Sequence, residues 1–161
     1  MNSKYEINRW KSILVSTLIA GTLDIFAAFI NAYISANIWP DMVLKYIASG
    51  VFGNDAYEGG GKMVLFGLIF HFTIALTCAV IFYFVYSKLS LLRNNVILNA
   101  FLIGVVAWIV TTHIVIPMSQ IPPPSFTLSK ALTSILILVI CIGIPIAYRA
   151  KQFYKRQYSK L

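Results

Sequence analysis

Four long apolar segments dominate this sequence, and short polar stretches separate them. They run at about residues 12–37, 63–87, 96–117 and 128–148. A helix needs about 20 apolar residues to cross a hydrocarbon core roughly 30 Å thick, and each segment reaches that length. We therefore predict an all-α integral membrane protein, a four-helix bundle with up-down-up-down topology, in a single membrane domain over 1–161.

The composition agrees with a chain that lies in lipid. Hydrophobic residues make up 59% of the sequence and charged residues 11%, against roughly 45–50% and 25% in soluble domains. The net charge of +8 would suggest nucleic acid in a soluble protein. Here most basic residues flank apolar segments, where such residues set orientation and attract anionic headgroups. The lipid bilayer is the expected partner, and nucleic acid is not.

The distribution of lysine and arginine predicts the orientation. Of the 13 such residues, ten fall at the N-terminus, the C-terminus or the loop between the second and third segments. Basic flanking residues stay in the cytoplasm, so we expect both termini there. Trp10, Tyr86 and Tyr148 are then expected at the inner membrane boundary, where aromatic side chains gather.

The loop at about 38–62 is predicted to contain a short helix. Pro40 and Asp41 suit the first turn of a helix, and apolar residues over 42–47 follow at helical spacing. The run is too short to span a bilayer. We predict an interfacial or re-entrant helix at about 40–53.

Prolines predict two further features. Pro122, Pro123 and Pro124 favour a stiff turn before the fourth helix, which Ser125 or Thr127 is expected to cap. Pro145 is expected to kink that helix near its far end.

Asp24 is the only charged residue deep in any apolar segment. The face that contains it is made of small or polar residues at helical spacing: Thr17, Gly21, Asp24, Ala28, Asn31 and Ser35. The opposite face is expected to hold Leu18, Ile25 and Phe29. Small faces let membrane helices pack closely, and charged groups at this depth usually face a bundle interior or a cavity. We therefore predict that Asp24 points inward.

Two interpretations of Asp24 stay open. In the structural one, a neutral acid forms a hydrogen bond across helices to a residue such as Thr77. In the functional one, Asp24 binds a proton or a cation, the usual meaning of a charge at this depth.

His71 is predicted to point inward as well, on a small face with Gly67, Ala75 and Cys78. Asn31 lies at a similar depth on the first helix. We predict an interior polar cluster of Asp24, Asn31, His71 and Thr77. It would act as a proton relay, since histidine titrates near neutral pH, or as an interhelical hydrogen bond.

Other polar residues lie toward the outer side. His113 is expected to face headgroups or a loop, with Asp55 and Glu58 on the same side of the membrane. No metal-binding spacing such as H-E-x-x-H occurs, and no nucleophile elbow G-x-S-x-G is present. We expect no metal, no cofactor and no enzymatic activity.

A resemblance appears around the third segment. The run from Thr112 to Met118, THIVIPM, followed by Gln120-Ile121-Pro122-Pro123, resembles the third span and following loop of bacterial YagU-like inner-membrane proteins. The second segment, from His71 to the basic residue Lys88, is similar as well. The resemblance implies a bacterial inner-membrane location and a plan with two histidines, but no reaction or ligand.

Together these features predict an integral inner-membrane protein with an interior polar cluster and no enzymatic activity. One alternative is a small proton- or cation-linked transporter that acts as an oligomer, which broken helices would favour. The other is an accessory or structural subunit of a larger membrane complex.

Overall fold

The computed structural model describes residues 3–88, 95–121 and 127–158, and its regular elements are all helical. Four rods are long and apolar enough to cross a membrane. The first rod is α1 (Ser3–Ala36), and the second is α4 (Gly60–Lys88). The third rod consists of three consecutive helices, α5 (Val96–Val110), η2 (Thr111–Val115) and α6 (Ile116–Met118). The fourth rod consists of α7 (Leu128–Leu138), η3 (Val139–Gly143) and α8 (Ile144–Tyr158). The predicted all-α fold with four spans is confirmed.

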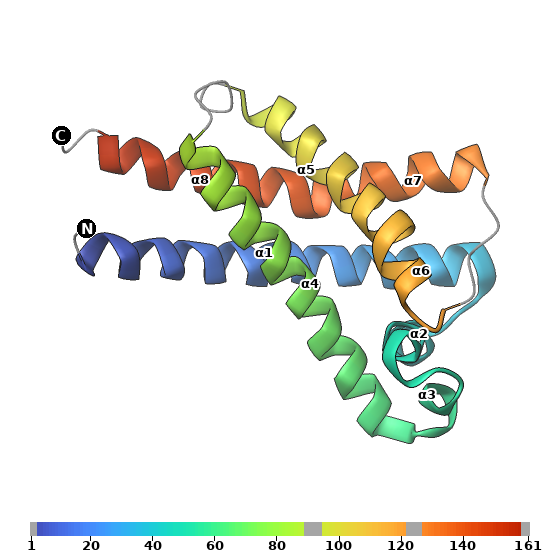
Figure 1. Ribbon diagram of the computed structural model, residues 1–161. Helices are drawn as coiled ribbons and strands as arrows, with labels where there is room; N and C mark the ends of the chain where they lie inside the picture. The colour runs from blue at the N-terminus through green and yellow to red at the C-terminus, as the bar shows by residue number, and fades with distance from the viewer. Residues whose placement is uncertain (1–2, 89–94, 122–126, 159–161) are drawn as a thin grey trace.

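The rods form two crossed layers (Figure 1). In one layer α1 lies beside the fourth rod, and in the other α4 and α5 cross that pair steeply. The N- and C-termini lie together at one end of the molecule, which we call the terminal end. The short helices α2 (Pro40–Phe52) and α3 (Asp55–Glu58) lie at the opposite end, which we call the loop end.

The short helix α2 confirms the helix predicted in the first long loop. Pro40 occupies its first turn, and Leu44 and Ala48 are buried. In Figure 1 α2 is seen nearly end-on while α1 runs across the page, so α2 lies across the loop end. It packs on α4 at Gly67, where a Cβ atom would lie 2.0 Å from the carbonyl oxygen of Leu44. Only glycine allows this approach of two backbones.

Two π-helical turns interrupt the third and fourth rods, and each ends two residues before a proline. These are η2 before Pro117 and η3 before Pro145. Proline has no N–H to donate, and its ring collides with the carbonyl four residues earlier. A widened turn relieves both problems. The predicted distortion at Pro145 thus takes the form of a π turn, and Pro117 produces a second one that we did not predict.

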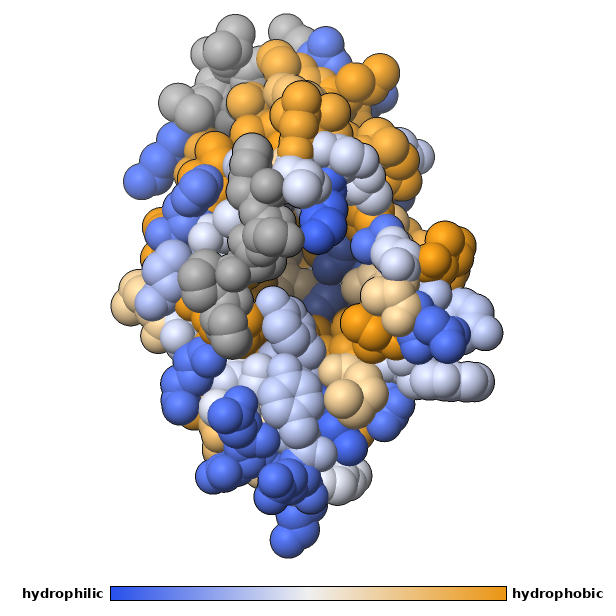
Figure 2. Space-filling view, turned by 90° about the vertical axis from the view of Figure 1, so that its right-hand side faces the viewer, coloured by the Kyte–Doolittle hydropathy of each residue, from blue (hydrophilic) through white to orange (hydrophobic). Residues whose placement is uncertain are grey.

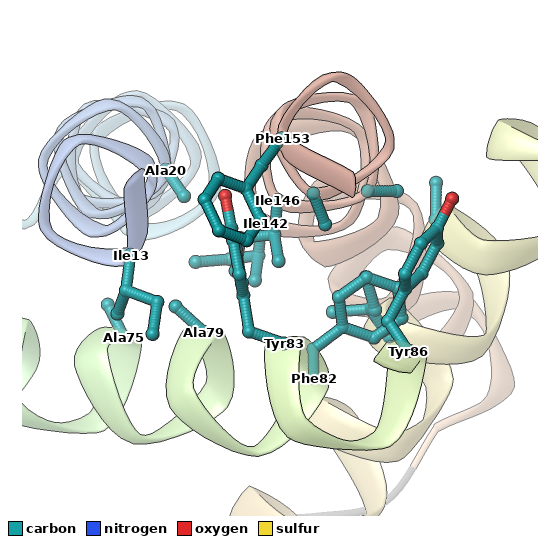
Figure 3. Packing of buried hydrophobic residues seen from close by; sticks show 14 of the residues in the cluster. Ile13, Ala20, Ala75, Ala79, Phe82, Tyr83, Tyr86, Ile142, Ile146 and Phe153 are labelled. Carbon is teal, nitrogen blue, oxygen red and sulfur yellow. The ribbon is translucent and has the colours of Figure 1, made fainter. Parts of the chain in front are cut away.

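The apolar core lies toward the terminal end, where α1, α4 and α8 meet (Figure 3). Ile13 of α1, Ala79 of α4 and Ile146 of α8 are completely buried in it. Tyr86, which we predicted at the inner membrane boundary, is only 2% exposed and stacks on Tyr154, so it packs in the core and does not face lipid. The fourth rod continues beyond the predicted boundary at residue 148, and this extra length supplies the core with Tyr154.

A close approach of backbones joins α5 to the fourth rod. A Cβ atom on Gly143 would lie 2.2 Å from the carbonyl oxygen of Ala100, and one on Gly104 would lie 2.7 Å from the amide nitrogen of Val139. Small residues allow membrane helices such close contact. These two glycines therefore fix the crossing of α5 over η3.

The cap predicted for the fourth rod is present. Thr127 precedes α7, and its hydroxyl accepts a hydrogen bond from the backbone N–H of Lys130 at 3.3 Å. Ser125 and the proline turn at 122–124 lie outside the described residues.

Candidate site around Asp24 and His71

Asp24 lies where three of the four rods meet. It is half-buried on α1 and interacts electrostatically with His71 and Cys78 of α4 and with Cys141 of η3. Within the described parts of the chain, its carboxylate makes no hydrogen bond and no ion pair. A carboxylate inside a membrane bundle without such a partner is costly, so this position calls for a functional explanation.

His71 is fixed beside Asp24 by a hydrogen bond between helices. It is buried on α4, and its Nε2 lies 2.8 Å from the carbonyl oxygen of Gly21 on α1. A carbonyl oxygen only accepts, so Nε2 carries a proton and donates it. The edge of the ring also packs against Phe72. Gly21 precedes Asp24 by one helical turn, and the bond therefore sets the position of the imidazole relative to the carboxylate.

Two members of the predicted cluster lie elsewhere. Thr77 is exposed, and its hydroxyl donates to the backbone carbonyl of Thr73 at 2.9 Å. Asn31 is exposed too, and its side chain accepts a hydrogen bond of 3.5 Å from Ser35. The prediction of an interior site with four residues was therefore wrong, and the structure brings together only Asp24 and His71.

Helix geometry explains both differences. At 100° per residue, the six positions from His71 to Thr77 turn the side chain about 240° around the helix axis, which takes it out of the interface. Asn31 lies two turns beyond Asp24 and is exposed. Because α4 crosses α1 steeply (Figure 1), the part of α1 that faces the bundle interior is shorter than its stripe of polar residues.

The face of α1 opposite to the polar one is not uniformly exposed. Leu18 is 59% exposed, but Ile25 is only 4% exposed. The reason is that α1 has neighbours on two sides, α4 in one layer and the fourth rod in its own layer. A helix with two neighbours buries more than one stripe.

The residues that we predicted on the outer side do not join the site. His113 is exposed and packs edge-on against Trp108, and Asp55 and Glu58 are exposed on α3. Among the described residues, no three histidine, cysteine or acidic side chains are grouped as a metal site requires.

A second polar cluster, in the terminal half, was missed from the sequence. The hydroxyl of Tyr83 lies 2.8 Å from that of Ser12 and 2.9 Å from that of Ser16. The hydroxyl of Tyr154 donates to the backbone carbonyl of Tyr83 at 2.7 Å. Figure 3 shows Tyr83 reaching from α4 into the space between α1 and α8. The signal was present: two serines four residues apart share one helix face, and a tyrosine lies in an apolar run.

The loop end of the molecule has a hollow in its surface (Figure 2). The hollow lies near the centre of that surface, and hydrophilic residues lie in it (Figure 2). The core cluster of Figure 3, by contrast, fills the space between the helices nearer the terminal end.

Comparison with known protein families, with curated proteins and with solved structures finds no match to this chain. The resemblance to YagU-like proteins stays a prediction, and the function has to be inferred from the site itself.

Proposed function

We propose that this multi-pass membrane protein carries protons or a small monovalent cation across the bilayer, with Asp24 as the binding group. The observation that supports the proposal most strongly is the state of Asp24. It is a half-buried carboxylate without a hydrogen-bond partner in the described structure, at the junction of α1, α4 and η3.

The depth of Asp24 supports a functional role over a structural one. The apolar rod runs from Asn8 to Ala36, and Asp24 falls in its middle third. A charged residue at the centre of a span costs about 2.5–3.5 kcal/mol on insertion scales. A purely structural acid would be expected to offset that cost through a hydrogen bond, as the hydroxyl of Tyr83 does with Ser12.

The fourth rod is interrupted beside Asp24. Its π turn η3 contains Cys141, whose side chain interacts electrostatically with Asp24. In transporters, interrupted membrane helices form the site of the coupling ion. An interrupted helix beside a carboxylate therefore supports a site for a proton or a small monovalent cation.

His71 supplies a second titratable group. Its Nε2 is engaged with Gly21, which leaves Nδ1 as the nitrogen available for proton exchange. We infer that protons pass between His71 and Asp24, or that the charge on His71 regulates how tightly Asp24 holds its cation.

The proposal includes an orientation and an assembly. Because ten of the 13 lysines and arginines belong to the terminal side, we propose that this end faces the cytoplasm of a bacterial inner membrane and that the loop end faces outward. The hollow of Figure 2 then opens to the outside. Since α4 and α5 barely touch each other, we propose a homo-oligomer that completes the path.

The test is ion flux into proteoliposomes that contain the purified chain and an internal pH-sensitive dye, driven by a potassium diffusion potential. We expect proton flux with the wild-type chain and none with Asp24→Asn. The matched control is Asp41→Asn, which removes an exposed acid 4.0 Å from Lys45 and is expected to leave flux unchanged. A wild-type chain that moves neither protons nor Na⁺ or K⁺ would contradict the proposal.

The accessory-subunit alternative gives a different result in the same experiment. If Asp24 serves only to hold the helices together, Asp24→Asn should change the circular dichroism and the elution profile in mild detergent, and wild-type vesicles should show no flux. Retained fold with lost flux supports transport.

A further inference from the structure

A groove of about 350 Å³ opens at the terminal end between α1 and α8. Its polar lining includes Lys11 and Ser12 from α1 and Arg149, Gln152 and Arg156 from α8. Its lining residues are distant in the sequence from Asp24 on α1 and from Cys141 on the fourth rod, and the groove plays no part in the proposed ion path.

The groove carries an excess of positive charge. Of the residues that the structure describes, three basic side chains line it and no acidic one does. Glu6 is the only acidic residue of the sequence on this side of the membrane, and it forms an ion pair with Arg9. An electropositive pocket without a carboxylate favours an anionic ligand.

Arg149 adds an observation independent of net charge. Its Nε is buried and makes no hydrogen bond within the described structure. A buried donor without an acceptor is destabilising, by about 1–3 kcal/mol or more for a charged group. Guanidinium groups match the geometry of phosphate oxygens closely. A phosphate in the groove would supply the acceptor that the protein lacks.

The level of the groove in the membrane indicates the source of the phosphate. Trp10 and Tyr148 are 45% and 53% exposed, and they are the sequence neighbours of Lys11 and Arg149. Exposed tryptophan and tyrosine at the ends of membrane helices lie among lipid headgroups. The groove thus lies at the depth where phospholipid phosphates are found.

We propose that this groove binds the phosphate of an anionic phospholipid headgroup, of the phosphatidylglycerol type, with Arg149 and Lys11 as its main ligands. Basic pockets between membrane helices on the cytoplasmic side bind such headgroups. The bound lipid contacts both α1 and α8 at the terminal end. The proposal does not depend on the ion-transport role of Asp24.

Native mass spectrometry of the full chain in mild detergent tests it, with phosphatidylglycerol and phosphatidylcholine of the same acyl chains as probes. We expect the wild-type chain to prefer phosphatidylglycerol and Arg149→Gln to reduce that preference about fivefold, since one basic residue near the surface contributes about that much. The matched control is Lys155→Gln, which removes an exposed charge from the same helix outside the groove lining. It should retain most of the preference.

Three results would overturn the proposal. The first is equal binding of the two lipids by the wild-type chain. The second is a loss in Lys155→Gln as large as that in Arg149→Gln, which would show a diffuse charge instead of a site. The third is displacement of the lipid by soluble glycerol phosphate, which would make a free phosphate the ligand. If Arg149→Gln does not fold, Lys11→Gln at an exposed position carries the same prediction.

Discussion

The two polar clusters of this molecule lie on the same helices, α1 and α4, but they differ in how well their polar groups are hydrogen-bonded. In the terminal half, the hydroxyl of Tyr83 is within hydrogen-bond distance of Ser12 and Ser16. Nearer the middle, the carboxylate of Asp24 makes no hydrogen bond within the described structure. A membrane interior penalises unsatisfied polar groups. The contrast indicates that the terminal cluster stabilises the fold, and it is the basis of the ion-binding role proposed for Asp24.

The packing of the helices also differs between the regions of the two clusters. Around Ile13 and Ile146 the helices are in close contact, whereas Asn31, beyond Asp24 on α1, is exposed. We call these two regions the closed half and the open half. In the proposed carrier, the closed half keeps its shape while the open half admits the ion. Each substitution below acts on one half and is expected to leave the other unaffected.

The largest effect on stability is expected from Gly143→Ala. The new Cβ would lie 2.2 Å from the carbonyl oxygen of Ala100, so α5 and η3 must move apart, at a cost of about 3 kcal/mol. The measurement is unfolding in mixed micelles titrated with a denaturing detergent. Gly61→Ala, where nothing lies within 4 Å of the new Cβ, is the control, and equal stability of the two variants would contradict the close approach.

His71→Gln should affect the open half. Glutamine retains a donor for the carbonyl of Gly21 but does not titrate, so the fold should persist while proton flux falls about tenfold, equivalent to ~1.4 kcal/mol. The assay is flux into proteoliposomes alongside circular dichroism. Unchanged flux would show that His71 is not part of the ion path and that Asp24 is the remaining candidate for the binding group.

Tyr83→Phe should affect the closed half by a smaller amount. The variant loses the contacts to Ser12 and Ser16, and interhelical hydrogen bonds in membranes contribute about 0.6 kcal/mol on average. Stability should fall by about that amount and flux should not change. Tyr148→Phe alters an exposed tyrosine and provides the baseline. A drop in flux with Tyr83→Phe would show that the two clusters do not act separately.

Thr77→Val should have the smallest effect. Thr77 is exposed, and its hydroxyl bonds to its own helix, so stability should stay within about 0.5 kcal/mol of wild type, as for ordinary surface positions. Flux should also be unchanged. A loss of flux would show that Thr77 belongs to the site around Asp24, as the sequence predicted.

Local features of the sequence predicted most of the fold. The four spans follow from hydropathy and length, α2 from the Pro40-Asp41 start, the Thr127 cap from side-chain chemistry and the distortion near Pro145 from the missing N–H. Each of these properties belongs to one segment, so one segment's residues are sufficient to predict it.

The misplaced residues depend on how helices cross. Periodicity identifies the stripe on α1 that holds Asp24, but the steep crossing with α4 decides how far along that stripe the interface extends, which excludes Asn31. Ile25 and Tyr86 are buried because a further helix lies against each of them. Thr77 is different, since its angular separation from His71 could have excluded it beforehand.

The central claim is that Asp24 exchanges a proton or a cation with the outside. Infrared difference spectroscopy of the reconstituted chain measures this directly, as the external pH or the Na⁺ concentration is stepped. We predict a carboxyl difference band that appears with the step, is absent in Asp24→Asn and is retained in Asp41→Asn. A wild-type spectrum in which no band depends on Asp24 under either step would contradict the account.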